Sequence, residues 1–184
     1  MTASRSRIPF TYEDYRTLPE DMSRRYELLH GELYMVPPPT TRHQRILGNL
    51  YLELRTHSES RRLGEVLLAP VDVILGHGSG REVAQPDMIF IAHARRDIVK
   101  LHGIEGAPDL VVEILSPGTA ERDRGYKRTL YARHDVREYW IVDPDARTVE
   151  VNTPGPDGYT APDAVLTSVL FPGLEIPLRV ILAD

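Results

Sequence analysis

Two carboxylates interrupt an apolar stretch in the second half of the chain. In APDLVVEILSP, Asp109 and Glu113 stand among valine, leucine and isoleucine residues that read as a buried strand. Side chains alternate between the two faces of a strand, so both acids point to the same face. A buried ionised carboxylate is costly unless a cation compensates it. The sequence therefore predicts a positively charged partner for these acids.

A third acid and a lysine extend this pattern into a set that can hold a divalent cation. Asp87 opens the apolar run in QPDMIFI, 26 residues before Glu113, which suits a connection between two neighbouring strands. Two carboxylates are enough for Mg²⁺ or Mn²⁺ when water and a phosphate complete the coordination shell. Lys127 follows Asp123 by four residues on a predicted helix, so both share one face. A lysine there can orient or deprotonate a water and stabilise charge on a phosphodiester.

Taken singly, most of these residues also have an ordinary structural explanation. Asp87 can be a turn residue after a proline, and Asp109 can accept backbone hydrogen bonds where its strand begins. Asp123 and Lys127 can form an exposed helical ion pair. Glu113 differs, because in the middle of an apolar strand it needs a buried cationic partner. The set as a whole is more specific than any one member.

The elements that must position these residues follow from periodicity and turn chemistry. A short helix is predicted over residues 11–18, with Thr11 as its N-cap and Asp14 completing a box-like cap. A hairpin over residues 26–36 turns at His30-Gly31. The longest helix should run from about residue 40 to 62, where apolar residues recur at helical spacing.

The remaining pattern predicts an α/β fold. The strand at 109–115 is apolar on both faces and should lie centrally. A helix after it should begin at Thr119, following the breaker Ser116-Pro117-Gly118. The architecture is then a central mixed β-sheet of about five to seven strands flanked by helices, with an N-terminal hairpin and C-terminal β-strands. Other expected elements are neighbouring extended segments at 65–75 and 83–91, a helix at 94–101, a hairpin of 137–144 with 148–153, and edge strands within 165–178.

Composition narrows the class of protein. The 184 residues, 41% hydrophobic and 27% charged, predict one soluble domain spanning residues 1–184, and no run reaches the roughly 20 apolar residues of a membrane span. No secretory signal is evident, so a cytoplasmic location is expected, and the absence of cysteine excludes disulfides and thiolate metal sites. A net charge of −5 argues against coating nucleic acid by bulk charge, but not against an enzyme that acts on it.

At these residues the sequence resembles the Uma family of restriction-endonuclease-type proteins, a former domain of unknown function in the PD-(D/E)XK nuclease superfamily. The similar segments are YELLHGELYMVPPP, the histidine of TTRH, QPDMIFI, APDLVVEILSPGTAERD, EYWIVDP and the late PGL, over about residues 26–178. The resemblance implies a restriction-endonuclease-like fold with Asp87 and Glu113 as metal ligands. It makes Glu32, in the GEL segment, a candidate for the metal shell or the site wall. His43 is a further supporting candidate, although a capping role is commoner.

The sequence departs from the superfamily pattern at the lysine. That pattern expects lysine two residues after the second acid, where this chain has Leu115. In some superfamily members the lysine has moved to the following helix, and Lys127 suits that arrangement. Asp135 stands where the family often has a glycine that ends the helix, and aspartate tolerates the left-handed conformation.

The resemblance therefore implies a Mg²⁺- or Mn²⁺-dependent endonuclease that hydrolyses DNA phosphodiester bonds. In this hypothesis Asp87 and Glu113 hold the metal, and Lys127 assists the attacking water. DNA is the expected partner, and a homodimer is plausible because double-strand cleavage needs two sites. Two alternatives stay open. One is a nuclease fold that has lost its chemistry and binds nucleic acid or a protein; the other is an α/β domain in which the acids form structural ion pairs.

Overall fold

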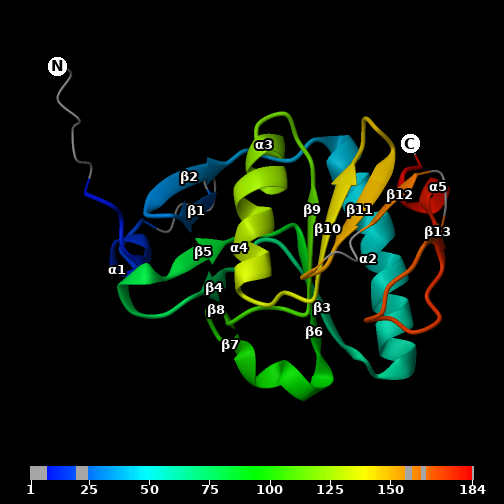
Figure 1. Cartoon of the computed structure of the whole chain (residues 1–184), viewed down its shortest axis with the longest axis horizontal. Coiled ribbons are helices and arrows are strands. Elements are labelled where there is room, and N and C mark those ends of the chain that lie inside the picture. Colours follow the sequence, from blue (N-terminus) through cyan, green and yellow to red (C-terminus); the bar gives the residue numbers. More distant parts are fainter. Residues whose placement is uncertain (1–7, 20–24, 156–158, 163–164, 184) are drawn as a thin grey trace.

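Two six-stranded mixed sheets form the framework of the described part of the chain (Figure 1). The computed structural model describes residues 8–19, 25–155, 159–162 and 165–183. The first sheet, here the hairpin sheet, has the strand order β2 (Glu32–Val36), β1 (Arg25–Leu29), β5 (Glu82–Ala84), β4 (Val73–Leu75), β8 (Gly103–Glu105) and β7 (Val99–Lys100). The second, here the central sheet, has the order β12 (Tyr159–Pro162), β11 (Thr148–Asn152), β10 (Glu138–Asp143), β9 (Leu110–Ile114), β6 (Met88–Ala92) and β3 (Gly64–Leu68).

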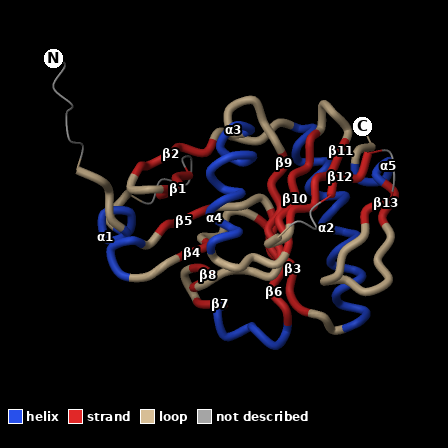
Figure 2. The backbone as a smooth tube through the Cα atoms, in the orientation of Figure 1, coloured by secondary structure: helices blue, strands red, loops and turns tan. Residues whose placement is uncertain are grey.

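The predicted central mixed sheet flanked by helices is confirmed, and the structure adds the hairpin sheet to it. The extended segments 65–75 and 83–91 are neighbours as expected, but a proline interrupts each of them, at Pro70 and Pro86. Proline has no N–H to donate to a strand ladder, so each segment breaks there. As a result β3 pairs with β6 in the central sheet, whereas β4 pairs with β5 in the hairpin sheet. Figure 2 shows the strands gathering into these two groups.

Strand β9 lies in the interior of the central sheet, as predicted. It pairs in parallel with β10 and antiparallel with β6, and all five of its residues are buried. Leu110, Val112 and Ile114 contribute to the core that packs under the long helix. Val111 contributes to a second core on the opposite face. The alternation read from the sequence is therefore confirmed, with Glu113 on the second face.

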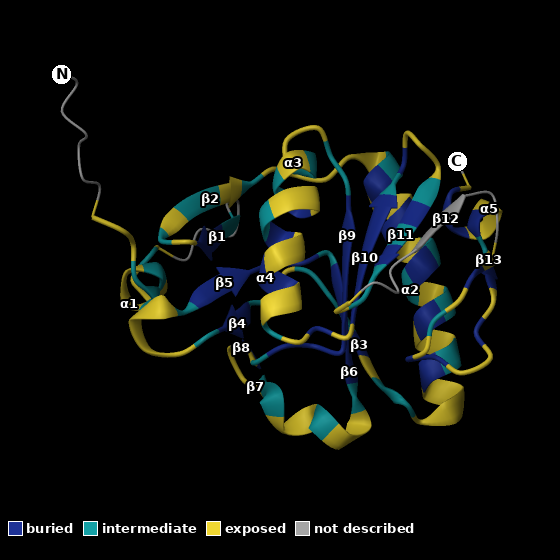
Figure 3. Ribbon diagram, in the orientation of Figure 1, coloured by how far each residue is buried: buried dark blue, intermediate teal, exposed yellow. Residues whose placement is uncertain are grey.

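Helices cover both faces of the central sheet (Figures 1 and 3). Helix α2 (Thr41–Arg61), capped by the Thr40 side chain, packs on one face through apolar residues that include Leu50 and Leu54. The C-terminal strands β13 (Val165–Leu166) and β14 (Ile176–Pro177) and helix α5 (Leu178–Ile181) add to the same core. The second core joins the hairpin sheet, the central sheet and the helical segment after β9. That segment consists of α3 (Ala120–Arg122), a π-helical turn η3 (Asp123–Lys127) and α4 (Arg128–Arg133).

Several turns and caps form where the sequence predicts them. Helix α1 (Tyr12–Arg16) has the predicted box between Thr11 and Asp14. The β1–β2 hairpin turns at His30 and Gly31, which both have positive φ as a tight primed turn requires. Asp135 adopts the left-handed conformation, with φ of 59°.

Two short segments differ from the prediction. The helix expected at 94–101 is a 3₁₀ helix, η2 (His93–Ile98), and the strands β7 and β8 follow it. A second 3₁₀ turn, η1 (Gly78–Gly80), joins β4 to β5. The segment PGPDGY (residues 154–159) predicts a loop, and residues 156–158 of it lie outside the described residues. Among the described helices, none is long and apolar enough to cross a membrane.

Candidate functional site

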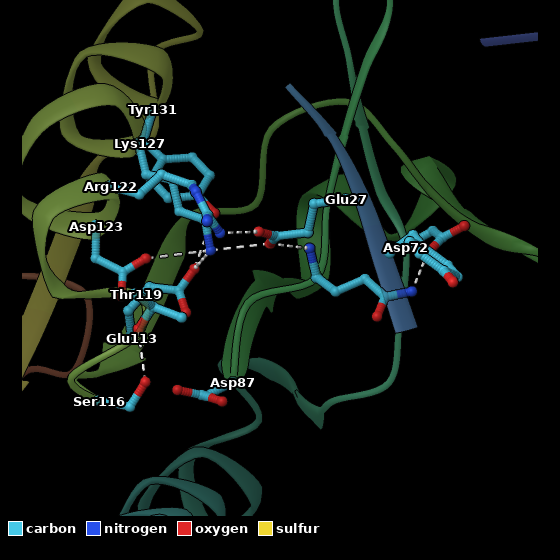
Figure 4. Close-up of polar contacts among 12 residues, drawn as sticks. Glu27, Asp72, Asp87, Glu113, Ser116, Thr119, Arg122, Asp123, Lys127 and Tyr131 are labelled. Carbon is cyan, nitrogen blue, oxygen red and sulfur yellow. Dashed lines mark hydrogen bonds and ion pairs between the residues drawn. The ribbon is translucent and has the colours of Figure 1, made fainter. Parts of the chain in front are cut away.

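A small cavity lies where the two sheets meet the start of α2 and the helical segment after β9. Its volume is about 40 Å³. Three acids face it, one from the hairpin sheet and two from the central sheet (Figure 4). The residues that line it are Arg25, Glu27, Val36, Pro37, Pro38, Pro39, His43, Gln85, Asp87, Glu113, Ile114, Ser116, Thr119 and Lys127.

Asp87 and Glu113 converge because their strands are neighbours. Met88 of β6 is paired with Val112 of β9, so Asp87, just before β6, lies beside the end of β9 that carries Glu113. Asp87 Oδ2 accepts a hydrogen bond from the backbone N–H of Ile114 at 2.8 Å. His43 Nε2 lies 3.0 Å from the same oxygen and donates to it from the first turn of α2. The aspartate is thus held on one side, and both acids line the same cavity.

Lys127 is the buried cation that the sequence predicted for Glu113. Its ammonium lies 2.8 Å from Glu113 Oε1, 2.8 Å from Glu27 Oε1 and 3.3 Å from Asp123 Oδ1 (Figure 4). The lysine side chain is only 4% exposed. The π-helical turn η3 turns both Asp123 and Lys127 toward the sheets, and such turns are frequent at functional sites. Leu115, at the position where the superfamily pattern expects lysine, packs against the second core.

Carboxylates outnumber the lysine at the cavity, and this shifts the pKa of several groups. Burial raises the pKa of Glu113; Lys127 opposes this, but Asp123 and Asp87 add to it, so the pKa lies well above its ordinary value. Burial also raises the pKa of Asp123. Burial alone would lower the pKa of Lys127, yet the surrounding carboxylates outweigh it and the pKa lies well above its ordinary value. The lysine therefore stays protonated at neutral pH, and the acids compete for too little positive charge.

Glu27 is a site residue that the sequence reasoning missed. It is 1% exposed on β1, and its Oε1 accepts a hydrogen bond from the backbone N–H of Gln85 and forms an ion pair with Lys127. Arg122 lies 3.7 Å from its Oε2. The available signal was an acid inside the short β-run of YELL, where a buried carboxylate needs a partner. Tyr131, also missed, donates a hydrogen bond to Glu113 Oε1 at 3.2 Å.

Two of the predicted supporting residues, unlike His43 and Asp123, lie neither at the cavity nor against Lys127. Asp109 is fully buried at the other end of β9, about 13 Å from Glu113 at ~3.3 Å per strand residue. It pairs with Arg95 at 3.2 Å and Arg137 at 3.5 Å, so its surroundings are those of a structural ion pair. Glu32 is exposed on β2 and accepts a hydrogen bond from the Tyr34 hydroxyl.

The donor set at the cavity fits one hard divalent cation. Within the described residues, Asp87 Oδ1 and Glu113 Oε2 make no hydrogen bond, which leaves one free carboxylate oxygen on each acid. The described part of the chain gathers no group of three or more His, Cys, Asp and Glu side chains that could hold a metal alone. Mg²⁺ does not need one, because it keeps several waters and takes only one or two carboxylates. The excess of negative charge also favours a cation here.

Comparison with solved structures defines the class of fold. The chain superimposes with a TM-score of 0.79 on a crystal structure from Anabaena variabilis described as a "putative nuclease belonging to DUF820". The match covers 95% of this chain and 98% of the other, at 21% sequence identity. The two proteins therefore share a mixed α/β fold with flanking helices. The search of the curated proteins gave no match.

The family is shown by the sequence itself. The model of the Uma2 family, described as "Putative restriction endonuclease", matches residues 12–179. The chain belongs to the Uma2 family. The resemblance noted on the motifs around Asp87 and Glu113 is thereby confirmed.

Proposed function

We propose that this protein is a metal-dependent endonuclease that hydrolyses DNA phosphodiester bonds. The observation that carries the proposal is the shared cavity of Asp87, Glu113 and Lys127, with a free oxygen on each acid and a buried ammonium beside Glu113. Membership of a family described as restriction endonucleases supports the same reaction. In the proposal Asp87 and Glu113 hold Mg²⁺ or Mn²⁺, and the carbonyl of Ile114 is a further candidate ligand. The bound ion would polarise the phosphate and make a water molecule more acidic.

The residues of the chain then have separate tasks. His43 and the N–H of Ile114 fix Asp87 Oδ2, which leaves Oδ1 for the ion. Lys127 is protonated, so it cannot act as the base in this state. It acts as a fixed positive charge that orients the water and stabilises the developing charge on the phosphate. The role of a base, which the sequence left open for this lysine, is therefore not the one we propose.

DNA as substrate and a homodimer for double-strand cleavage are parts of this proposal. The alternative of a module without chemistry is favoured by one feature, the leucine at position 115 where the superfamily pattern expects lysine. A protein of that kind would keep the fold and bind a partner without cutting. The same experiment separates the two.

The test is cleavage of supercoiled plasmid DNA with Mg²⁺ or Mn²⁺. The wild type should nick the plasmid. In Asp87→Asn and Glu113→Gln the cleavage rate should fall at least about 100-fold, since each substitution removes a charged metal ligand. Glu32→Gln is the matched control, because this acid is exposed and outside the cavity. Lys127→Met, checked for folding by circular dichroism, should also lose activity. Equal rates for all variants, or no cleavage by the wild type, would reject the proposal.

A further inference from the structure

A second and much larger cavity opens beside the site. Its volume is about 980 Å³. Helix α1 with Leu18 and Pro19, the start of β1 and the β7–β8 hairpin contribute to its walls. Nothing in the proposed metal chemistry uses this cavity. Its lining shows what kind of molecule could bind there.

The lining is rich in cations that have no acidic partner in the part of the chain that the structure describes. Arg16, Arg25, Arg81 and Lys100 line the cavity, against only two acids, Asp72 and Glu105, in a chain whose net charge is −5. The carboxylate of Asp72 is already engaged by the Tyr15 hydroxyl and the Gln85 side chain. None of the four cations forms an ion pair with a described residue. The positive charge there is therefore available to an anion.

Aromatic side chains stand among these cations. Tyr12, Tyr15 and Tyr26 line the cavity and are half-buried, and the Arg81 guanidinium lies 5.1 Å from the centre of the Tyr12 ring. Cations that take phosphates, interleaved with rings that stack on bases, are the features of single-strand nucleic-acid sites.

The two cavities are adjacent and share residues. Arg25 and Gln85 line both of them. The backbone N–H of Gln85 binds Glu27 in the small cavity, while its side-chain amide donates to Asp72 in the large one. Figure 4 shows Asp72 on the side of Glu27 that faces away from Glu113. A linear polymer with one phosphate bound at Asp87 and Glu113 would continue past Arg25 into the large cavity.

We propose that this cavity binds unpaired nucleotides of the DNA strand that flank the phosphate to be cleaved. Arg25, Arg81 and Lys100 would contact phosphates, and Tyr26 would stack on a base. The proposal rests on the proposed nuclease function, because it takes the acids as the point of cleavage. It adds that the substrate must be single-stranded beside that point, whether from the start or by local opening.

Binding can be tested without cleavage. The fluorescence anisotropy of a labelled short oligothymidylate is measured with EDTA present, over a range of salt concentrations. Arg81→Gln and Lys100→Gln should each weaken binding about three- to ten-fold and reduce the slope of log affinity against log salt by about 0.7. Tyr26→Leu should weaken binding at least about five-fold with an unchanged slope, because stacking involves no charge. Arg128→Gln is the matched control, since this arginine is exposed on α4 outside both cavities.

The outcomes distinguish this proposal from the proposed function. Equal affinity for the wild type, Arg81→Gln, Lys100→Gln and Tyr26→Leu, or equal loss with Arg128→Gln, would overturn the binding site even if plasmid is cleaved. Weaker binding by the cavity variants alone would support the site. If plasmid is then not cleaved, the endonuclease assignment fails and the strand-binding cavity stands. A thermal melt of each variant confirms that it is folded.

Discussion

The pKa of Glu113 depends on its burial and on the charged groups around it. Its pKa is raised by burial and by neighbouring acids, although Lys127 touches it. The folded protein therefore holds this proton more tightly than the unfolded chain does. As pH rises from the ordinary range of glutamate through the raised pKa, the unfolded chain loses its proton first, so the free energy of unfolding falls.

We predict that Glu113→Gln flattens this part of the pH dependence. At higher pH the variant should be at least as stable as the wild type, since Lys127 keeps Glu27 and Asp123 as partners. Urea denaturation of the metal-free protein at a series of pH values measures this. Glu32→Gln is the control, because this exposed acid should leave the profile unchanged. A loss of several kcal/mol on Glu113→Gln at all pH values would instead indicate a purely structural ion pair.

His43 is a positioning residue for Asp87, and its effect should appear in metal binding. His43→Ala removes the donor to Asp87 Oδ2 and should weaken Mn²⁺ binding about 10-fold, the scale of such supporting contacts. His43→Gln keeps an N–H donor and should recover part of the affinity. Calorimetric titration with Mn²⁺ measures both variants. The same affinity in the wild type, His43→Ala and His43→Gln would show that the histidine only packs.

At the scale of elements, the sequence predicted what local chemistry determines. The cap of α1, the hairpin turn at His30-Gly31 and the central place of β9 all follow from short patterns. The four-residue spacing also placed Asp123 and Lys127 on one face correctly. The π-helical turn that carries them was not predictable, because it depends on the fit of the helix between two sheets. The second sheet was not predicted, because it depends on the strands breaking at Pro70 and Pro86 and pairing separately on either side.

Asp109 joins elements instead of serving the site. It accepts a hydrogen bond from the backbone N–H of Ala92 at the end of β6, and it pairs with Arg95 and Arg137. We predict that Asp109→Asn lowers the free energy of unfolding by about 2 kcal/mol, because the buried charge-assisted contacts are lost while the arginines regain water. Urea denaturation measures the loss. The rate of plasmid cleavage per folded molecule should not change. A lower rate would show that Asp109 contributes to the function of the site.

At the scale of the whole molecule, the site exists only because distant segments meet. Asp87 and Glu113 come from neighbouring strands, so their convergence was predictable from strand order. Glu27 comes from the other sheet, and no local pattern in the sequence connects it to Lys127. The lysine thus holds together the hairpin sheet, the central sheet and the helical segment after β9 by one ammonium group. Removing that charge should lower the free energy of unfolding of the protein as well as its catalytic activity.

We predict that Lys127→Met destabilises the protein by about 3–5 kcal/mol, because it leaves Glu27, Glu113 and Asp123 buried without their cation. If Asp87 and Glu113 hold a divalent ion, that ion supplies part of the missing charge, and ligands that bind only the folded state raise its stability. Mn²⁺ should therefore raise the melting temperature of Lys127→Met more than that of the wild type. Lys100→Met is the matched control, because Lys100 is exposed and is the chain's other lysine. Equal Mn²⁺-induced shifts in melting temperature for all three proteins would mean that no metal ion binds close enough to the acids around Lys127 to replace its charge. A metal site at Asp87 and Glu113 would then be contradicted.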